Sequence, residues 1–487
     1  MDNRLSAPGT SPIAGPPPPR RRLRWPRRVL VVALAGGVAA GAVLTLSPRD
    51  RRHGMAPAPA AGPRAQAPAA VTFGVPAALP QLTALIGQQE QRVRAQPRDA
   101  RAWAVLGSAY VERGREAADP ASFPKAEQAL RTSLRVRGAR NTEALDGLAA
   151  LALARRDFPA AKQYAEQALK ASPGRWASYP PVIDAYNGLG DYDAAHKALD
   201  KLLGLRTGAA ARPAVMARAA AVYRDRGWRE DAVAQLTDAA AAARTPAEQA
   251  AYLTGLGQLA WERGDLKEAL RHFEAALRLE PGRRGALTGR GRTLAALGRT
   301  TEALTAYRTA LARQPDPQDI LELGELYESL GQDRSATAQY AQLRTRVRQA
   351  VAAGVDEELL IGRFEADHGD PFEAVERLEE EYRRQPGIEV ADALGWALHR
   401  AGDDKEALTY ASVATDKTKG GGVRSAPYAF HRGIIEGELE LYGPARRHLQ
   451  EALRINPYFS PLRAPEAREA LAALGDVPEE PLPAEAP

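Results

Sequence analysis

The stretch LGQLAWERGDLKEALRHFEAALRLEP, residues 256–281, has a counterpart further along this chain of 487 residues. Residues 290–315 read RGRTLAALGRTTEALTAYRTALARQP. Five small or helix-ending residues recur 34 positions later: Gly257, Gly264, Ala269, Ala276 and Pro281 return as Gly291, Gly298, Ala303, Ala310 and Pro315. A fixed period of this length is typical of stacked structural repeats.

The residue types in this pattern predict two antiparallel helices joined by a tight turn. Ala269 and Phe273 lie four residues apart and therefore share one face of a helix. Gly257 is small where the two helices approach each other most closely. Gly264 stands just past the first helix, where glycine adopts a positive φ most easily. Pro281 ends the second helix because it lacks the amide proton.

The same register continues along the chain for about ten units. The first unit carries Trp103, Leu106, Gly107 and Tyr110, and so resembles the tetratricopeptide-repeat (TPR) family, whose pattern runs W-x2-L-G-x2-Y…A-x3-F…P. The resemblance covers residues about 98–460, and residues 394–402 and 456–462 also resemble bacterial membrane-anchored TPR proteins. It implies an all-α, right-handed TPR superhelical solenoid of antiparallel helix pairs. We expect this solenoid over residues 79–474, with capping helices at 79–96 and 464–474.

The N-terminal segment predicts a membrane anchor. Residues 1–28 are Pro-rich and contain six Arg between Arg20 and Arg28, and residues 29–46 are uncharged. Eighteen such residues form roughly 27 Å of helix, enough to cross the hydrocarbon core. The positive-inside rule places residues 1–28 in the cytoplasm and the repeats outside it. Secretion after cleavage of a signal peptide is the alternative.

Two features accompany this predicted anchor. Gly37 and Gly41 have the spacing that lets two membrane helices approach closely, so a homodimer through them is a candidate. The Ala/Pro-rich residues 47–78 predict a tether, and the acidic, Pro-rich residues 475–487 predict a disordered tail.

The basic pI of about 9.4 does not indicate a nucleic-acid-binding body. Residues 1–80 hold eleven Arg and two Asp, a net charge of +9, whereas the whole chain carries +6. Residues 81–487 therefore carry about −3, while nucleic-acid-binding proteins concentrate positive charge on the binding surface. The chain has no Cys, which excludes disulfides, thiolate zinc sites and Cys nucleophiles.

Sequence motifs of catalysis are missing, so we predict that the chain is not an enzyme and has no cofactor or resident metal. No two of the seven His have the HExxH spacing that places two metal ligands on one helical face. His399 and His431 are about one repeat apart and are the best pair for a shared metal, but they bring no further ligands.

The TPR resemblance implies that the first helices of the repeats line a concave groove that binds peptides. The residues that would face it are Trp261, Arg292, Glu389, Asp392, Trp396, His399, Phe430 and His431. Packing between repeats is the alternative for Trp396 and Phe430. We therefore expect a non-catalytic, membrane-tethered scaffold for protein or peptide partners. A cytoplasmic-facing adaptor and an accessory subunit of a membrane enzyme or secretion complex stay open as alternatives.

Overall fold

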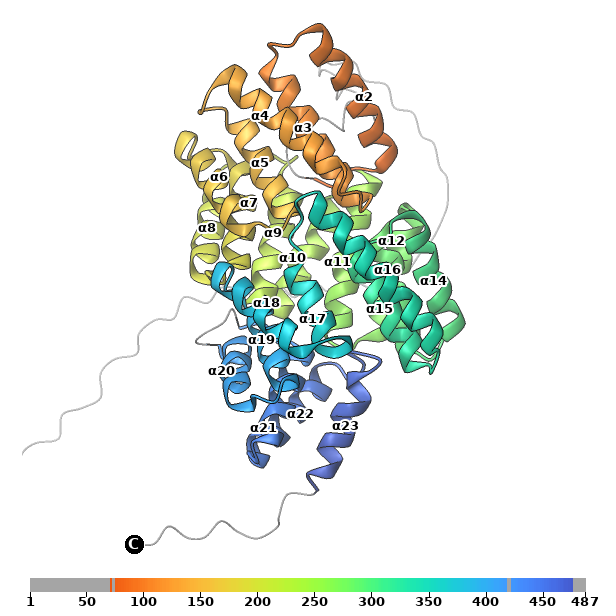
Figure 1. The fold of residues 1–487 in the computed structure, drawn as a ribbon. Coiled ribbons are helices and arrows are strands. Elements are labelled where there is room, and N and C mark those ends of the chain that lie inside the picture. Colours follow the sequence, from red (N-terminus) through yellow and green to blue (C-terminus); the bar gives the residue numbers. More distant parts are fainter. Residues whose placement is uncertain (1–70, 72–74, 418–421, 476–487) are drawn as a thin grey trace, which may run out of the picture. The chain divides into compact units, whose positions relative to one another are not determined.

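The structure is a computed structural model that describes residue 71 and residues 75–417 and 422–475. Its described residues form 22 α-helices, one short 3-10 helix (Trp176–Ser178) and no β-strand (Figure 1). The prediction of an all-α helical-repeat solenoid is therefore confirmed.

Ten helical hairpins follow one another between the single helices α2 (Leu79–Ala95) and α23 (Arg463–Ala473). The first five are α3 (Ala100–Glu116) with α4 (Ser122–Arg137), α5 (Thr142–Ala154) with α6 (Phe158–Ala171), α7 (Tyr179–Gly188) with α8 (Tyr192–Gly204), α9 (Arg212–Asp225) with α10 (Arg229–Ala242), and α11 (Pro246–Glu262) with α12 (Leu266–Leu279). The last five are α13 (Arg284–Ala296) with α14 (Thr300–Arg313), α15 (Pro317–Ser329) with α16 (Asp333–Ala352), α17 (Glu358–His368) with α18 (Pro371–Arg384), α19 (Ile388–Arg400) with α20 (Asp404–Thr415), and α21 (Ala426–Glu438) with α22 (Tyr442–Ile455).

The fifth hairpin explains why the sequence folds in this way. Gly257 lies against the ring of Phe273, and a Cβ on this glycine would come within 2.6 Å of that ring. Ala269 is fully buried between the two helices. Gly264 has a φ of +73°, and the side chain of Asp265 caps α12 by accepting a hydrogen bond from the backbone of Glu268. The turn and the close helix contact both follow from the repeated small residues.

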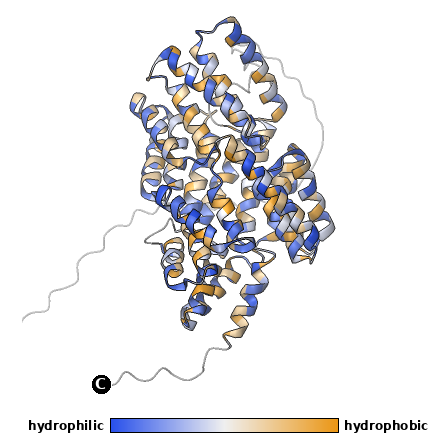
Figure 2. Ribbon diagram, viewed as in Figure 1, coloured by the Kyte–Doolittle hydropathy of each residue, from blue (hydrophilic) through white to orange (hydrophobic). Residues whose placement is uncertain are grey.

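Apolar side chains are buried along the whole array of hairpins. Figure 2 shows hydrophobic and hydrophilic residues alternating around the described helices, as expected for helices with one buried face. Each hairpin shares its core with the next one, so that, for example, Leu323 of α15 packs in one cluster with Leu294 and Tyr307 of the preceding hairpin. Such a solenoid is stabilised mainly by contacts between neighbouring repeats.

A second kind of contact joins hairpins that are far apart in the sequence. We call the segment inside a hairpin a turn and the segment between two hairpins a linker. Four consecutive turns, α5/α6, α7/α8, α9/α10 and α11/α12, contact four consecutive linkers, α16/α17, α18/α19, α20/α21 and α22/α23. We call these four contacts, together with one from α5/α6 to α18/α19, the seam.

Backbone groups make most of the seam. The hydrogen bonds across it run from Asp356 N to Arg155 O at 2.8 Å, from Phe158 N to Gln385 Oε1 at 2.8 Å, from Ile388 N to Tyr192 Oη at 3.3 Å, from the Arg229 guanidinium to Arg424 O, and from Asn456 Nδ2 to Trp261 O at 2.8 Å. The sequence pattern predicted the hairpins and did not predict these contacts, because each joins residues about 195–230 positions apart.

The predicted anchor and tails fall largely outside the described residues. Residues 29–46, with Gly37 and Gly41, are among these, as are residues 1–28, most of 47–78 and all but one residue of 475–487. Among the helices of the described residues, none has the length and apolar character needed to cross a membrane.

Candidate functional site

Four of the predicted groove residues form one aromatic cluster. The Trp396 ring of α19 stacks on His431 of α21 with ring centroids 4.4 Å apart. His399 and Phe430 lie 4.9 Å and 5.7 Å from the same indole ring. Asp392 joins the cluster because its carboxylate is 3.0 Å from Nδ1 of His431. The structure thus brings together five residues that the sequence placed on two different repeats.

Burial gives several of these residues a packing role. Phe430 is fully buried, and Trp396 and Asp392 are 4% and 2% exposed. Trp396 and Phe430 belong to the core that joins the last hairpins, as the packing alternative expected. His399 and His431 are half-buried, and His399 Nδ1 lies 2.6 Å from a carboxylate oxygen of Asp404. Partner contact at these residues stays a prediction.

The other predicted residues lie on earlier and later first helices. The Arg292 guanidinium of α13 stands 5.6 Å from the ring of Trp261 and forms an ion pair with Glu322 of α15 at 2.7 Å. Trp261 itself is buried. Glu389 is exposed at the start of α19. Only Glu389 among the eight predicted residues presents a largely exposed side chain.

A carboxylate next to the aromatic cluster connects it to other helices. Trp396 Nε1 donates a hydrogen bond of 2.9 Å to Asp367 of α17. The guanidinium of Arg463, from α23, forms an ion pair with Asp367 and lies 5.4 Å from the centroid of the Trp396 ring. An arginine over an aromatic face gains from the ring quadrupole as well as from the carboxylate. One face of Trp396 is therefore occupied by a cation from the same chain.

Glu325 of α15 is a carboxylate beside Asp367 whose charge no ion pair compensates in the described part of the chain. Within the described residues it forms no hydrogen bond and no ion pair. Burial, and next the charge of Asp367, raise the pKa of the Glu325 carboxyl to about 8, while Arg463 acts in the opposite direction. We name Glu325, Asp367, Trp396 and Arg463 the Glu325 site. Glu325 is the unpaired carboxylate of this site and suits a guanidinium or ammonium group, whereas Asp367 already pairs with Arg463 and Arg400. The Trp396 ring is covered by His431 and Arg463.

Sequence reasoning missed Glu325 and Asp367, although one signal was present for Glu325. It follows Gly324 directly, as Arg292 follows Gly291 and Trp396 follows Gly395. All three hold the same position on the first helix of a repeat. Asp367 carries no such signal, because it was recognisable only from its hydrogen bond to Trp396.

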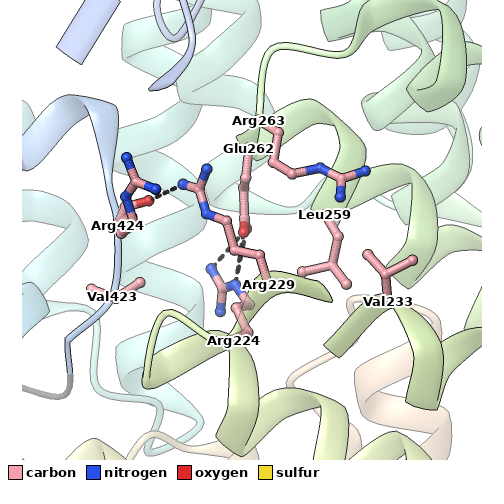
Figure 3. A pocket seen from close by; sticks show the side chains of 8 residues that line it. All are labelled: Arg224, Arg229, Val233, Leu259, Glu262, Arg263, Val423 and Arg424. Carbon is pink, nitrogen blue, oxygen red and sulfur yellow. Dashed lines mark hydrogen bonds and ion pairs between the residues drawn. The ribbon is translucent and has the colours of Figure 1, made fainter. Parts of the chain in front are cut away.

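A crevice of opposite charge lies at the seam, between the α20/α21 linker and the α9/α10 turn region. Four arginines line it together with Val233, Leu259, Val423 and Glu262: Arg224, Arg229, Arg263 and Arg424 (Figure 3). Glu262 is engaged by Arg224 at 2.8 Å, and Arg424 pairs with Glu451 at 2.7 Å. Burial and the neighbouring Arg424 lower the pKa of the Arg229 guanidinium. The crevice is narrow and helps to hold the seam.

Groups for metal binding are not assembled in the described residues. No set of three or more His, Asp or Glu side chains there is arranged to hold a metal ion. His399 and His431, the best candidates for a shared metal, each pair with a carboxylate of their own surroundings.

Residues 218–283 and 254–320 match the family model described as tetratricopeptide repeat. Residues 218–320 form tetratricopeptide repeats. The solved human IFIT1 dimer with m7Gppp-AAAA is 17% identical over 66% of this chain and 72% of its own, with a TM-score of 0.45. A tetratricopeptide repeat protein from Parabacteroides merdae is 19% identical over 54% of this chain and 99% of its own, with a TM-score of 0.33. Pseudomonas aeruginosa pilF is 17% identical over 42% and 90%, with a TM-score of 0.34. No curated protein matches the chain in sequence.

The order of the hairpins gives the Glu325 site its place in the array. Glu325, Asp367 and Trp396 belong to the first helices of the seventh, eighth and ninth hairpins. These are the helices that the TPR resemblance expects along the concave groove. The site therefore lies on the first helices of three successive hairpins.

Proposed function

We propose that this protein is a non-catalytic scaffold that binds a basic segment of another protein at the Glu325 site. The observation that carries the proposal is the surplus carboxylate there. Glu325 has no ion-pair partner among the described residues, and burial beside Asp367 raises its pKa to about 8. A cation from a partner would remove this unfavourable interaction. The helical-repeat fold supports a binding role in general, and the site supplies the chemistry.

Arg463 makes the contacts that we expect of a cationic side chain from the partner. Its guanidinium contacts both the Asp367 carboxylate and the Trp396 ring, which are two of the three recognition elements. It comes from α23, the single helix after the last hairpin. A partner arginine or lysine would either displace Arg463 or bind beside it at Glu325. Because surface ion pairs contribute little by themselves, the partial burial of Glu325 supplies much of the affinity, and the Trp396 ring adds to it only where the partner displaces Arg463.

Protein is the favoured partner class over nucleic acid. Phosphate groups require clustered positive charge, whereas this site is acidic and residues 81–487 carry a net charge of about −3. The Arg crevice is positive, but it is narrow and its Arg224 and Arg424 side chains are held by carboxylates.

We also propose that residues 29–46 tether this scaffold to a membrane, with the repeats on the extracytoplasmic side. Eighteen uncharged residues after six Arg support this placement. Secretion after cleavage, a cytoplasmic-facing adaptor and an accessory subunit of a membrane enzyme or secretion complex are the competing assignments. Protease accessibility in intact cells separates the two orientations.

The binding proposal is tested with a labelled oligo-arginine peptide and purified full-length protein. We expect Glu325→Gln to weaken binding about tenfold, the effect of about 1.4 kcal/mol. Glu380→Gln is the matched control, because Glu380 is an exposed carboxylate on α18. Oligo-glutamate should not bind. Equal affinities of the two variants, or stronger binding of a single-stranded RNA, would overturn the proposal.

A further inference from the structure

The seam ends part-way along the array of turns. A Cβ on Gly190, Gly227 or Gly264, in the turns of the third to fifth hairpins, would lie 2.5–3.0 Å from an atom of a distant linker. The turn glycines of later hairpins also have a positive φ, but a Cβ on them would meet nothing within 4 Å: Gly298, Gly331 and Gly402. The turns α13/α14, α15/α16 and α19/α20 have the same positive-φ glycine and no described linker on them, whereas Gly369 of the α17/α18 turn has a φ of −141°.

The linkers, like the turns, divide into a group that makes seam contacts and a group that does not. Gly354, Gly387 and Gly422, in three of the seam linkers, lie close to a turn. A Cβ on Gly138, Gly174 or Gly208, in linkers of the first three hairpins, would meet nothing within 4 Å. The array therefore has a free edge of turns and a free edge of linkers.

The chain itself explains where the seam ends. The fourth and last covered turn, α11/α12, takes the linker α22/α23, which is the last linker of the described residues. The turn α13/α14 comes next and has no further described linker to receive. The seam stops at this turn because no described linker remains to cover it. The α13/α14 turn itself has the same positive-φ glycine as the covered turns.

Exposed large apolar side chains lie on both free edges, as well as at three positions of the seam segments: Trp228, Val351 and Tyr458. On the turn edge they are Leu297, Leu330, Phe372, Leu441 and Tyr442, of which Phe372 is 69% exposed. Close to the free linkers they are Val136 and Leu203. Grouped apolar residues on a surface are typical of interaction sites.

We propose that the free turns of one copy bind the free linkers of a second copy, so that the seam continues from molecule to molecule. We assign a second copy as the partner because linkers of this chain already contact turns of this kind at four places within the chain. Two different surfaces meet in such a contact, so it is head-to-tail, and further copies can add at both ends. This contact is independent of the Glu325 site and of Gly37 and Gly41.

Two edge variants test the contact in full-length protein, purified in one detergent and studied by sedimentation velocity. Phe372→Glu with Leu330→Glu places charges on the turn edge, and Leu203→Glu with Val136→Glu places them near the linker edge. Gln128→Glu is the matched control, because Gln128 is exposed in the middle of α4, away from the turn and the linker at its two ends. Thermal unfolding followed by circular dichroism verifies that every variant is folded.

We expect concentration-dependent association of the wild type and of Gln128→Glu, and loss of every species larger than the monomer for each edge variant alone. A mixture of the two edge variants should form a dimer and nothing larger, because each still carries one intact edge. A monomeric wild type, as expected if residues 476–487 of the same molecule cover the free turns, would overturn the proposal. Association that is lost on changing Gly37 and Gly41 and kept in both edge variants would overturn it as well.

Discussion

The carbonyl oxygen of Pro386 lies 2.6 Å from the position that a Cβ on Gly190 would occupy. Gly190 belongs to the α7/α8 turn and Pro386 to the α18/α19 linker, so two segments almost two hundred residues apart meet backbone to backbone. The same glycine therefore has two constraints, a φ of +73° and the approach of a distant chain segment.

Alanine at Gly190 should reveal the seam in a stability measurement. A positive φ costs alanine about 1 kcal/mol, and the contact with Pro386 should add about 1–3 kcal/mol of overpacking. Gly298→Ala is the matched control, because Gly298 has a φ of +74° and open space around it. We expect urea denaturation to give a clearly larger loss for Gly190→Ala. Equal losses would mean that the seam contributes no stability.

The side chain of Asn456 gives a second measure of the seam. It is 2% exposed and donates a hydrogen bond of 2.8 Å to the carbonyl oxygen of Trp261. Asn456→Asp removes this donor at constant shape and brings a carboxylate oxygen towards the carbonyl. We expect a loss of about 1–3 kcal/mol in the free energy of unfolding.

Hydrogen exchange identifies where the Asn456→Asp effect arises. The amides of the α11/α12 turn and of the α22/α23 linker should both lose protection, although they are far apart in sequence. Loss confined to the linker would mean that the effect arises within the linker and not at the bond to Trp261.

The hairpins were predictable because each depends on a few residues close together in the sequence. Gly264 at a turn and Ala269 at a helix contact have a local physical reason, which repeats every 34 residues. The seam has no such local signal. Gly190 and Gly298 look identical in the sequence, and only the number of intervening repeats decides that one is covered and the other is free.

The candidate site was predictable in part for a related reason. The repeat register identified Trp396 and His431, which do meet, because positions on neighbouring first helices are adjacent. The repeat register did not identify Glu325. The pKa of this carboxyl depends on the charges of Asp367 and of Arg463 from α23, which are far from Glu325 in the sequence.

Trp396→Ala tests whether this residue acts mainly in packing. Its indole is 4% exposed, stacks on His431 and donates to Asp367. Truncation should cost about 3–5 kcal/mol, as for large aromatic residues in cores. Trp228→Ala is the control, because Trp228 is 42% exposed, and we expect it to cost much less. Similar small losses for both variants would mean that Trp396 does not act mainly in packing.

The Glu325 carboxyl should make stability depend on pH. Burial beside Asp367 raises its pKa from 4.5 to about 8, so the folded protein holds this proton more tightly than the unfolded chain does. The resulting stability is fully present below pH 4.5 and is lost as the pH rises to about 8. Glutamine stays neutral throughout. Glu325→Gln should therefore match the wild type at low pH and exceed it above pH 8, by about 1–2 kcal/mol because solvent screens part of the effect.

Urea denaturation of both proteins at several pH values measures this difference, with Glu380→Gln as the exposed control. The same proton links stability to binding. A cation placed beside Glu325 lowers its pKa and releases the proton, so the affinity for the oligo-arginine peptide should rise with pH up to about 8. A stability difference that is constant with pH, together with a flat affinity profile, would show that Glu325 is ionised in the free protein and is not the uncompensated group.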